Sequence, residues 1–168
     1  MIAWFHLCPI KKRIKMENVK QILIEHPIDI PELNVKGLAD IIVELESGEV
    51  YVYDIKTIGS WSWRFKFGRK KENKPSIHQE LQLGTYGYGI RSELGRCDGL
   101  FLLYYNKDNS EMREVEIDLE FIDLSYNFWT RAEDLHSDGL PPLQQGESPV
   151  MEWECKYCQY ENLCNERG

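Results

Sequence analysis

The most restrictive feature of the sequence is an uninterrupted apolar segment, GLFLLYY, at residues 99–105. A strand with apolar side chains on both faces is suited to the centre of a sheet that is covered on both sides. Sheets of this kind are typical of α/β proteins, in which helices cover the faces. The segment therefore predicts a mixed sheet flanked by helices.

The segments around this central strand supply the other elements of such a fold. Alternating or β-branched patterns predict further strands at residues 19–30, 37–45, 49–55 and 113–117. Helices are expected from Pro75 and Ser76 to about Leu94 and over residues 119–137, with a long loop at residues 57–75. The chain has 168 residues, 42% of them hydrophobic, which is enough for one domain with its own core.

Two consecutive strands place acidic side chains at one edge of the predicted sheet. Asp40 lies on one strand, and Asp54 lies near the end of the next. Hairpin-connected strands lie side by side, so the two carboxylates can converge, and they would repel each other unless a cation lay between them. Oxygen ligands, with the Ile55 carbonyl as a further donor, suit Mg²⁺ or Mn²⁺.

Lys56 is two residues from Asp54 and therefore points to the same face of its strand. Its ammonium group could orient a water molecule or stabilise a negatively charged transition state. The alternative interpretation is an ordinary surface ion pair between Asp54 and Lys56.

Gln82 and Tyr86 are four residues apart on a predicted helix, so they share one face. A polar Gln on a largely buried helix needs a hydrogen-bond partner, such as a phosphate, a base or a metal-bound water. The simpler alternative is that both side chains face solvent.

Three of the five cysteines lie close together in a C-x2-C-x5-C pattern, formed by Cys155, Cys158 and Cys164. In a cytosolic protein this pattern indicates a metal centre rather than disulfides. Cys8 is the candidate for a fourth ligand, and four thiolates suit either an iron–sulfur cluster or zinc. Cys97 begins the central strand and is interpreted as a small buried residue.

The net charge of −8 argues against a general nucleic-acid binder. A basic segment nevertheless stands out at residues 64–74, which hold six basic side chains and one acidic one. Four aromatic residues lie in or beside it: Trp61, Trp63, Phe65 and Phe67. The segment is a solvated loop, an aromatic lid on the core, or a DNA contact in which aromatics stack on bases and cations bind phosphates.

Taken together, these motifs resemble the RecB-like branch of the PD-(D/E)XK nucleases, in particular CRISPR-associated RecB-like exonucleases and AddB-type nuclease domains. The resemblance runs from Cys8 through Asp40, Asp54-Ile55-Lys56 and Gln82-x3-Tyr86 to Cys164. It implies a restriction-endonuclease-like mixed sheet flanked by helices, with the Cys-rich tail docked near the N-terminus. It also implies one domain over residues 1–168, with a nuclease core at 18–138 and an iron–sulfur clasp at 8 and 150–168.

The activity implied by the resemblance is Mg²⁺- or Mn²⁺-dependent exonuclease hydrolysis of phosphodiester bonds in single-stranded or end-containing DNA. The implied catalytic residues are Asp40, Asp54, Lys56, Gln82 and Tyr86, with Asp40, Asp54 and Ile55 as metal ligands. The implied second cofactor is a 4Fe–4S cluster on Cys8, Cys155, Cys158 and Cys164. The candidate DNA-binding residues are Arg64, Lys66, Arg69, Lys70 and Lys71.

The expected partners are DNA and proteins of CRISPR adaptation, phage replication or recombination. The family's metal-binding His has no counterpart, because His6 precedes Cys8 and His26 lies in a predicted strand beside Pro27. The alternative function is therefore a catalytically weak or inactive DNA-binding or assembly subunit of a nuclease complex. Glu25, on the strand before Asp40, either matches a carboxylate often found there in the family or is a surface residue.

The sequence contains no sign of a membrane protein. No apolar run reaches the ~18 residues that a membrane helix needs. In the first segment, MIAWFHLCPIKKR, the charges follow the apolar stretch, which is the wrong order for a secretory signal. We expect a cytoplasmic protein without membrane contact.

Overall fold

The computed structural model describes residues 18–68 and 77–137, together with Gln159 and Asn162. The chain forms two compact units, Met1–Trp129 and Thr130–Gly168, and the features below belong to the first, except for the end of the last helix. Several sequence predictions lie outside the described residues. They concern Cys8, Cys155, Cys158 and Cys164, the docking of the tail, and the basic residues Arg69, Lys70 and Lys71.

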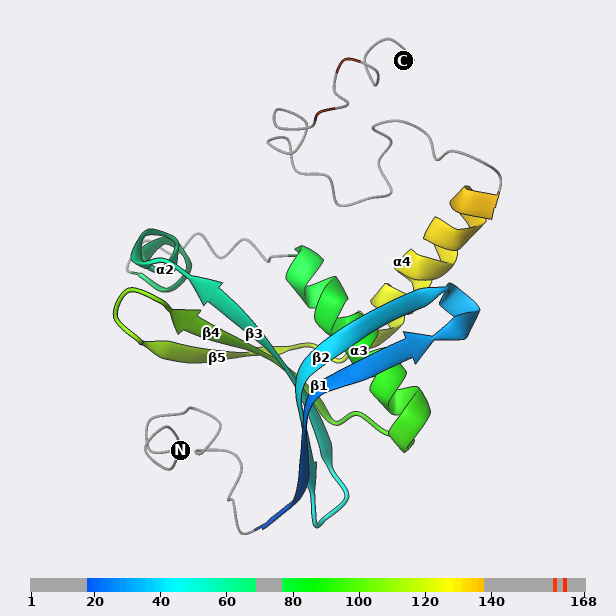
Figure 1. The fold of residues 1–168 in the computed structure, drawn as a ribbon, viewed down its shortest axis with the longest axis horizontal. Coiled ribbons are helices and arrows are strands. Elements are labelled where there is room, and N and C mark those ends of the chain that lie inside the picture. The colour runs from blue at the N-terminus through cyan, green and yellow to red at the C-terminus, as the bar shows by residue number, and fades with distance from the viewer. Residues whose placement is uncertain (1–17, 69–76, 138–158, 160–161, 163–168) are drawn as a thin grey trace. The chain divides into compact units, whose positions relative to one another are not determined.

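Five strands form one mixed sheet in sequence order, as Figure 1 shows. They are β1 (Val19–Ile30), β2 (Val35–Leu45), β3 (Val50–Ile58), β4 (Gly99–Asn106) and β5 (Met112–Ile117). β3 and β4 are parallel, and the other neighbouring strands are antiparallel. The predicted mixed α/β architecture is confirmed, with strand bounds within a few residues of those expected.

The helices α3 (Ile77–Leu94) and α4 (Glu120–Ser137) also agree with the predictions. The loop predicted at residues 57–75 is wrong in its first half, because β3 continues to Ile58 and α2 (Ser60–Phe67) follows. The Ser60 amide donates a hydrogen bond to Asp108 Oδ2 at 2.6 Å, and Asp108 lies 48 residues further along the chain. A local reading of the sequence could not find this cap. None of the described helices has the length and apolar character needed to cross a membrane.

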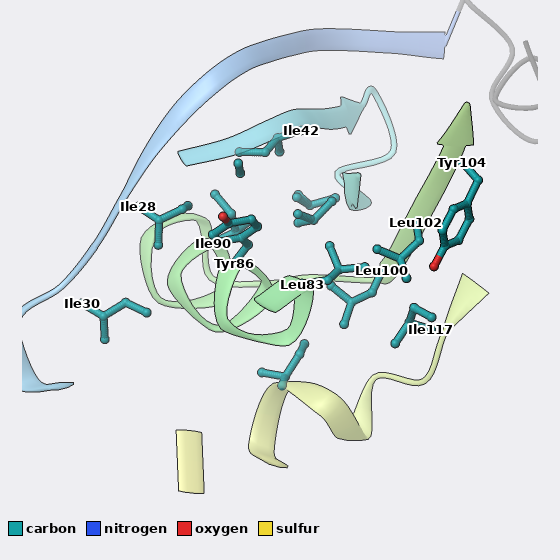
Figure 2. Close-up of a cluster of buried hydrophobic side chains, with 14 of the residues drawn as sticks. Ile28, Ile30, Ile42, Leu83, Tyr86, Ile90, Leu100, Leu102, Tyr104 and Ile117 are labelled. Atoms are coloured by element: carbon teal, nitrogen blue, oxygen red, sulfur yellow. The ribbon is translucent and has the colours of Figure 1, made fainter. Parts of the chain in front are cut away.

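The main core lies between α3 and the strands, as Figure 2 shows. Leu83, Tyr86 and Ile90 of α3 belong to the same buried cluster as Leu100 and Leu102 of β4. On the other face of β4, Phe101 stacks on Tyr53 of β3 at a ring distance of 4.9 Å, in a smaller second cluster. β4 is therefore buried on both faces, as its uninterrupted apolar sequence predicts.

The β1–β2 hairpin belongs to the sheet over only part of its length. β2 pairs with β3 from Ile41 to Glu44. The part of the hairpin that contains the β2 residues before Ile41 does not pair with β3 and lies across α3 (Figure 1). A Cβ atom on Gly89 of α3 would lie 2.5 Å from Ile28 Cγ2 of β1, which shows how closely the two elements approach. The departure of β2 from β3 opens a fork in the sheet, and the candidate site lies there.

Candidate active site

Asp40 and Asp54 lie at the fork between β2 and β3. At the fork, the pairing of β2 with β3 stops at the pair formed by Ile41 and Tyr53. Asp40 precedes Ile41 on β2 and Asp54 follows Tyr53 on β3, so both acidic residues lie just outside the paired stretch. The Ile55 amide donates a hydrogen bond to Asp40 Oδ2 at 2.6 Å. A carboxylate therefore satisfies an amide of β3 at the point where the neighbouring strand leaves it.

Asp54 carries a carboxylate that is almost completely buried, with the residue 3% exposed. Burial raises the pKa of Asp54, the Lys56 ammonium opposes this effect, and the negative charge of Asp40 adds to it. Oδ2 lies 2.7 Å from Lys56 Nζ. The contact is an ion pair between a buried carboxylate and a largely buried ammonium group. Asp54 and Lys56 do pair, but in a buried setting rather than on the surface.

A chain of hydrogen bonds continues from Lys56 to α3. Lys56 Nζ donates to Gln82 Oε1 at 2.7 Å, and Gln82 Nε2 donates to Tyr86 Oη at 2.8 Å. Tyr86 is only 8% exposed, so the interpretation that it faces solvent is wrong. The two motifs, one on β3 and one on α3, therefore form a single network.

Gly37 makes room for this network, and sequence reasoning gave it no role. A Cβ atom at Gly37 would lie 2.7 Å from Tyr86 Cε1, closer than unbonded carbon atoms approach. Gly37 and Asp40 belong to one G-x-x-D segment of β2. This segment therefore supplies a carboxylate to the site and also the space in which the Tyr86 ring lies.

The donors at the fork suit a divalent cation. Two carboxylates and the Ile55 carbonyl are hard oxygen ligands of the kind that Mg²⁺ and Mn²⁺ prefer. Asp54 Oδ2, buried and without a hydrogen bond from the described residues, is the atom that a cation would satisfy best. In the part of the chain that the structure describes, no three His, Cys, Asp or Glu side chains form a metal-binding group. Water or substrate oxygens would therefore complete the coordination shell.

His26 and Glu25 of β1 do not extend this site. His26 Nε2 lies 3.0 Å from Glu93 Oε2, so its described partner is on α3 and not at the fork. Glu25 stands opposite Asp40 and is exposed, and the β1–β2 pairing skips it.

Two of the aromatic residues of α2 point inward. Trp63 is buried in the core, and Phe67 packs edge-on against Tyr104 at a ring distance of 5.3 Å. Lys66 Nζ lies over the Tyr104 ring at 4.6 Å. Burial lowers the pKa of Lys66, and the nearby Glu80 carboxylate opposes that effect. The inner face of α2 therefore agrees with the alternative in which this segment is an aromatic lid on the core.

The other face of α2 is exposed. Trp61 and Phe65 lie together there, with ring centroids 4.4 Å apart, and Trp61 is 74% exposed. Arg64 is exposed on the same short helix, whereas Lys66 is half-buried. Of the two described candidate DNA-binding residues, Arg64 is therefore the one that is open to a ligand.

Comparison with known proteins shows the family. The PD-(D/E)XK nuclease superfamily matches residues 7–165, which is nearly the whole chain. The chain belongs to this superfamily. The resemblance to PD-(D/E)XK nucleases that the motifs indicated is thus confirmed.

The chain is also similar to individual proteins. The CRISPR-associated exonuclease Cas4 of Saccharolobus solfataricus is 28% identical over 130 residues, which cover 77% of this chain and 52% of that protein. The chain therefore spans about half the length of this curated relative. The crystal structure of SSO0001 has 22% sequence identity and a TM-score of 0.45, covering 88% of this chain and 62% of that one.

We expect Asp54→Asn to stabilise the metal-free protein at neutral pH. The folded-state pKa of Asp54 is raised above its unfolded value, so ionised Asp54 destabilises the fold. The free energy of unfolding of the wild type therefore decreases as the pH rises from about 4 through the raised pKa of Asp54. The asparagine variant has no carboxyl group at this position and does not show that decrease. Urea unfolding in EDTA should show the variant more stable at pH 7 and equal to wild type below about pH 4.

Asp29→Asn is the matched control, because Asp29 pairs with Lys36 at 3.1 Å on the exposed side of the β1–β2 hairpin. This control should show no gain in stability at pH 7. Lower stability of Asp54→Asn than of wild type at pH 7 would contradict the assignment of a destabilising buried charge.

Proposed function

We propose that this chain is a metal-dependent DNA nuclease, an exonuclease that uses Mg²⁺ or Mn²⁺ on single-stranded or end-containing DNA. The observation that carries the proposal is the buried Asp54 carboxylate beside Asp40, joined through Lys56 to Gln82. Membership of the PD-(D/E)XK nuclease superfamily and similarity to a protein named as a CRISPR-associated exonuclease support it. Proteins of CRISPR adaptation, phage replication or recombination are the proposed partners.

Asp40, Asp54 and the Ile55 carbonyl would hold the metal ion, which when bound would polarise the phosphate and activate a water molecule. Lys56 holds a positive charge at a fixed place, because its ammonium lies between Asp54 and Gln82 with its side chain 19% exposed. A fixed charge in a poorly hydrated site stabilises the negative charge that develops on phosphoryl oxygens. Gln82 is oriented by Tyr86, and this keeps its oxygen directed at Lys56.

A second candidate function is a DNA-holding subunit with weak or absent catalysis. It is favoured by the metal site, in which the described residues provide two carboxylates and no third acidic, His or Cys ligand. Cleavage assays with purified protein separate the two candidates.

We expect Asp54→Ala to reduce DNA cleavage by at least about 1,000-fold, because a lost metal ligand removes several kcal/mol of transition-state stabilisation. Lys56→Met should lower kcat far more than DNA affinity, since affinity depends on several phosphate contacts. Asp29→Ala and Lys36→Met are matched controls from the exposed ion pair of the β1–β2 hairpin, and both should cleave normally. Cleavage of labelled oligonucleotides with Mn²⁺ or Mg²⁺ measures these effects.

Wild-type rates in Asp54→Ala would disprove the active-site assignment. Tight DNA binding by wild-type protein without cleavage in either metal would favour the DNA-holding function instead.

We also propose that the exposed side of α2 binds the unpaired strand of the substrate. α2 begins two residues after β3 ends, so it directly follows the strand that carries Asp54 and Lys56. Aromatic faces stack on bases of any sequence, and an exposed guanidinium pairs with phosphate. Trp61, Phe65 and Arg64 provide these groups on one helix that is anchored to the core by Trp63.

Trp61→Ala should weaken binding to single-stranded oligonucleotides by about tenfold to a hundredfold, since each stacked base contributes roughly 1–3 kcal/mol. The loss should vanish for an abasic oligonucleotide of equal length. Arg64→Gln should instead flatten the salt dependence of binding, by a log–log slope of about 0.7. Leu124→Ala, which removes an exposed apolar side chain from α4, is the control. Unchanged affinity in Trp61→Ala would exclude α2 from the DNA path.

We further propose a 4Fe–4S cluster on Cys8, Cys155, Cys158 and Cys164. The C-x2-C-x5-C spacing supports it, as does the unsuitability of Cys97, the remaining cysteine. Burial raises the pKa of the Cys97 thiol to about 11, and its Sγ lies 3.8 Å from the Gly99 carbonyl oxygen. A buried thiol that lies against a carbonyl of its own strand is a structural residue rather than a cluster ligand.

Protein purified without oxygen should be brown and contain about four iron atoms, as expected of one such cluster. Cys155→Ala should lose the iron and lower the Tm, because ligation free energy becomes folding free energy. Cys97→Ala should keep the iron. Zinc in place of iron in anaerobically prepared protein would contradict the cluster, and full iron content in Cys8→Ser would exclude Cys8.

A further inference from the structure

The face of β1 that points toward the core changes part-way along the strand. Ile28 and Ile30 are each 2% exposed, so regular alternation would turn Ile24 inward as well. Ile24 is instead 71% exposed, and Leu23 packs against the core. The alternation therefore shifts by one residue between Ile24 and His26.

The face of β2 that points toward the core also changes, at the residues that pair with this part of β1. Ala39 and Ile42 are 0% and 1% exposed and lie in the same core cluster. Residues three apart in a regular strand face opposite sides of the sheet. The alternation of β2 therefore shifts between Ala39 and Ile42, a stretch that contains Asp40.

Glu25 is the residue at which the two shifts meet. Ile24 pairs with Ile41 and His26 pairs with Ala39, which leaves Glu25 opposite Asp40 with no shift in register. Glu25 has a φ of 51°, in the left-handed region that residues other than glycine seldom adopt. No residue is inserted there, so the positive φ of Glu25 is the backbone irregularity of β1 that coincides with the change of face.

We propose that Glu25 is a positioning residue that acts through its backbone: its left-handed conformation reverses the faces of the β1–β2 hairpin and thereby turns the Asp40 carboxylate into the fork beside Asp54. On one side of Glu25 the hairpin pairs with β3, and on the other side it covers α3 (Figure 1). Asp40 stands at the change-over, where its carboxylate accepts the hydrogen bond of the Ile55 amide. The inference rests on the proposed function, since it concerns the carboxylate that would hold the metal ion.

The test compares side chains that tolerate a positive φ with one that does not. Glu25→Gly and Glu25→Asn adopt positive φ readily, whereas a β-branched valine does so very rarely. Glu25→Gly and Glu25→Asn should bind Mn²⁺ as wild type does in calorimetric titrations. Glu25→Val should weaken Mn²⁺ binding by about tenfold or more, the loss typical of a misoriented ligand.

Hydrogen exchange of the Ile55 amide is the second readout, because this amide reports on Asp40 without metal, DNA or cleavage. It should stay protected in the glycine and asparagine variants and lose protection in Glu25→Val. Asp29→Val is the matched control, with the same substitution at an exposed position of β1 that lacks a positive φ. It should retain both properties.

Weak Mn²⁺ binding in Glu25→Gly or Glu25→Asn would overturn the proposal, because it would show that the carboxylate itself is needed. Wild-type Mn²⁺ binding and Ile55 protection in Glu25→Val would overturn it as well, because the bend would then be unnecessary. Should Glu25→Val fail to fold, Glu25→Ala replaces it, since alanine also disfavours positive φ. Absence of nuclease activity in wild-type protein would refute the proposed function but leave the Ile55 result standing.

Discussion

The site depends on one constraint, which is that backbone amides need partners at the point where a neighbouring strand leaves the sheet. β2 pairs with β3 only from Ile41 onward, and the Ile55 amide of β3, which lies outside this pairing, is satisfied by the Asp40 carboxylate. The side chain that closes the fork is therefore also a proposed metal ligand. The opening in the sheet and the proposed catalytic site are one feature of the fold, and a change that restored regular pairing would remove the site.

The sequence predicted most of the architecture because its strongest patterns are local. The central strand, the hairpins and the long helices follow from apolar runs, alternation and turn residues that lie close together. The grouping of Asp40 with Asp54 followed from hairpin geometry, and that of Gln82 with Tyr86 from helical spacing. The link between these two pairs, through Lys56 and Gln82, depends on how α3 packs on β3 and has no signal in the sequence.

The features that the sequence did not predict depend on distant residues or on backbone conformation. α2 is capped by Asp108, and its inner aromatics pack on Tyr104 of β4. The change of face in β1 was hidden, because Ile22, Ile24, Ile28 and Ile30 occupy alternate positions and imply one continuous buried face. The structure exposes Ile22 and Ile24. The positive φ of Glu25 has no counterpart in this regular alternation.

The packing of α2 connects the core to the proposed DNA contact. Trp63 and Phe67 lie on the inner face, and the Arg113 guanidinium of β5 lies 5.1 Å from the Phe67 ring centroid. Such cation–π contacts hold the helix against the β4–β5 side of the sheet. Trp61 and Phe65 are therefore displayed by an anchored element, and stacking on them requires less ordering than stacking on a loop.

The ionisation of the buried Asp54 carboxylate bears on the choice between a catalytic and a DNA-holding function. A buried carboxylate whose pKa is raised destabilises the metal-free fold, and one ion pair with Lys56 offsets only part of that effect. A protein that only held DNA would be more stable with a neutral residue at this position, and phosphate would bind more readily without the negative charge. A cation at the fork reverses both arguments, since it stabilises the ionised carboxylate and attracts phosphate. Under the proposed function, a bound cation would therefore offset the destabilising charge of Asp54, and this is the argument for the enzyme over the DNA-holding subunit.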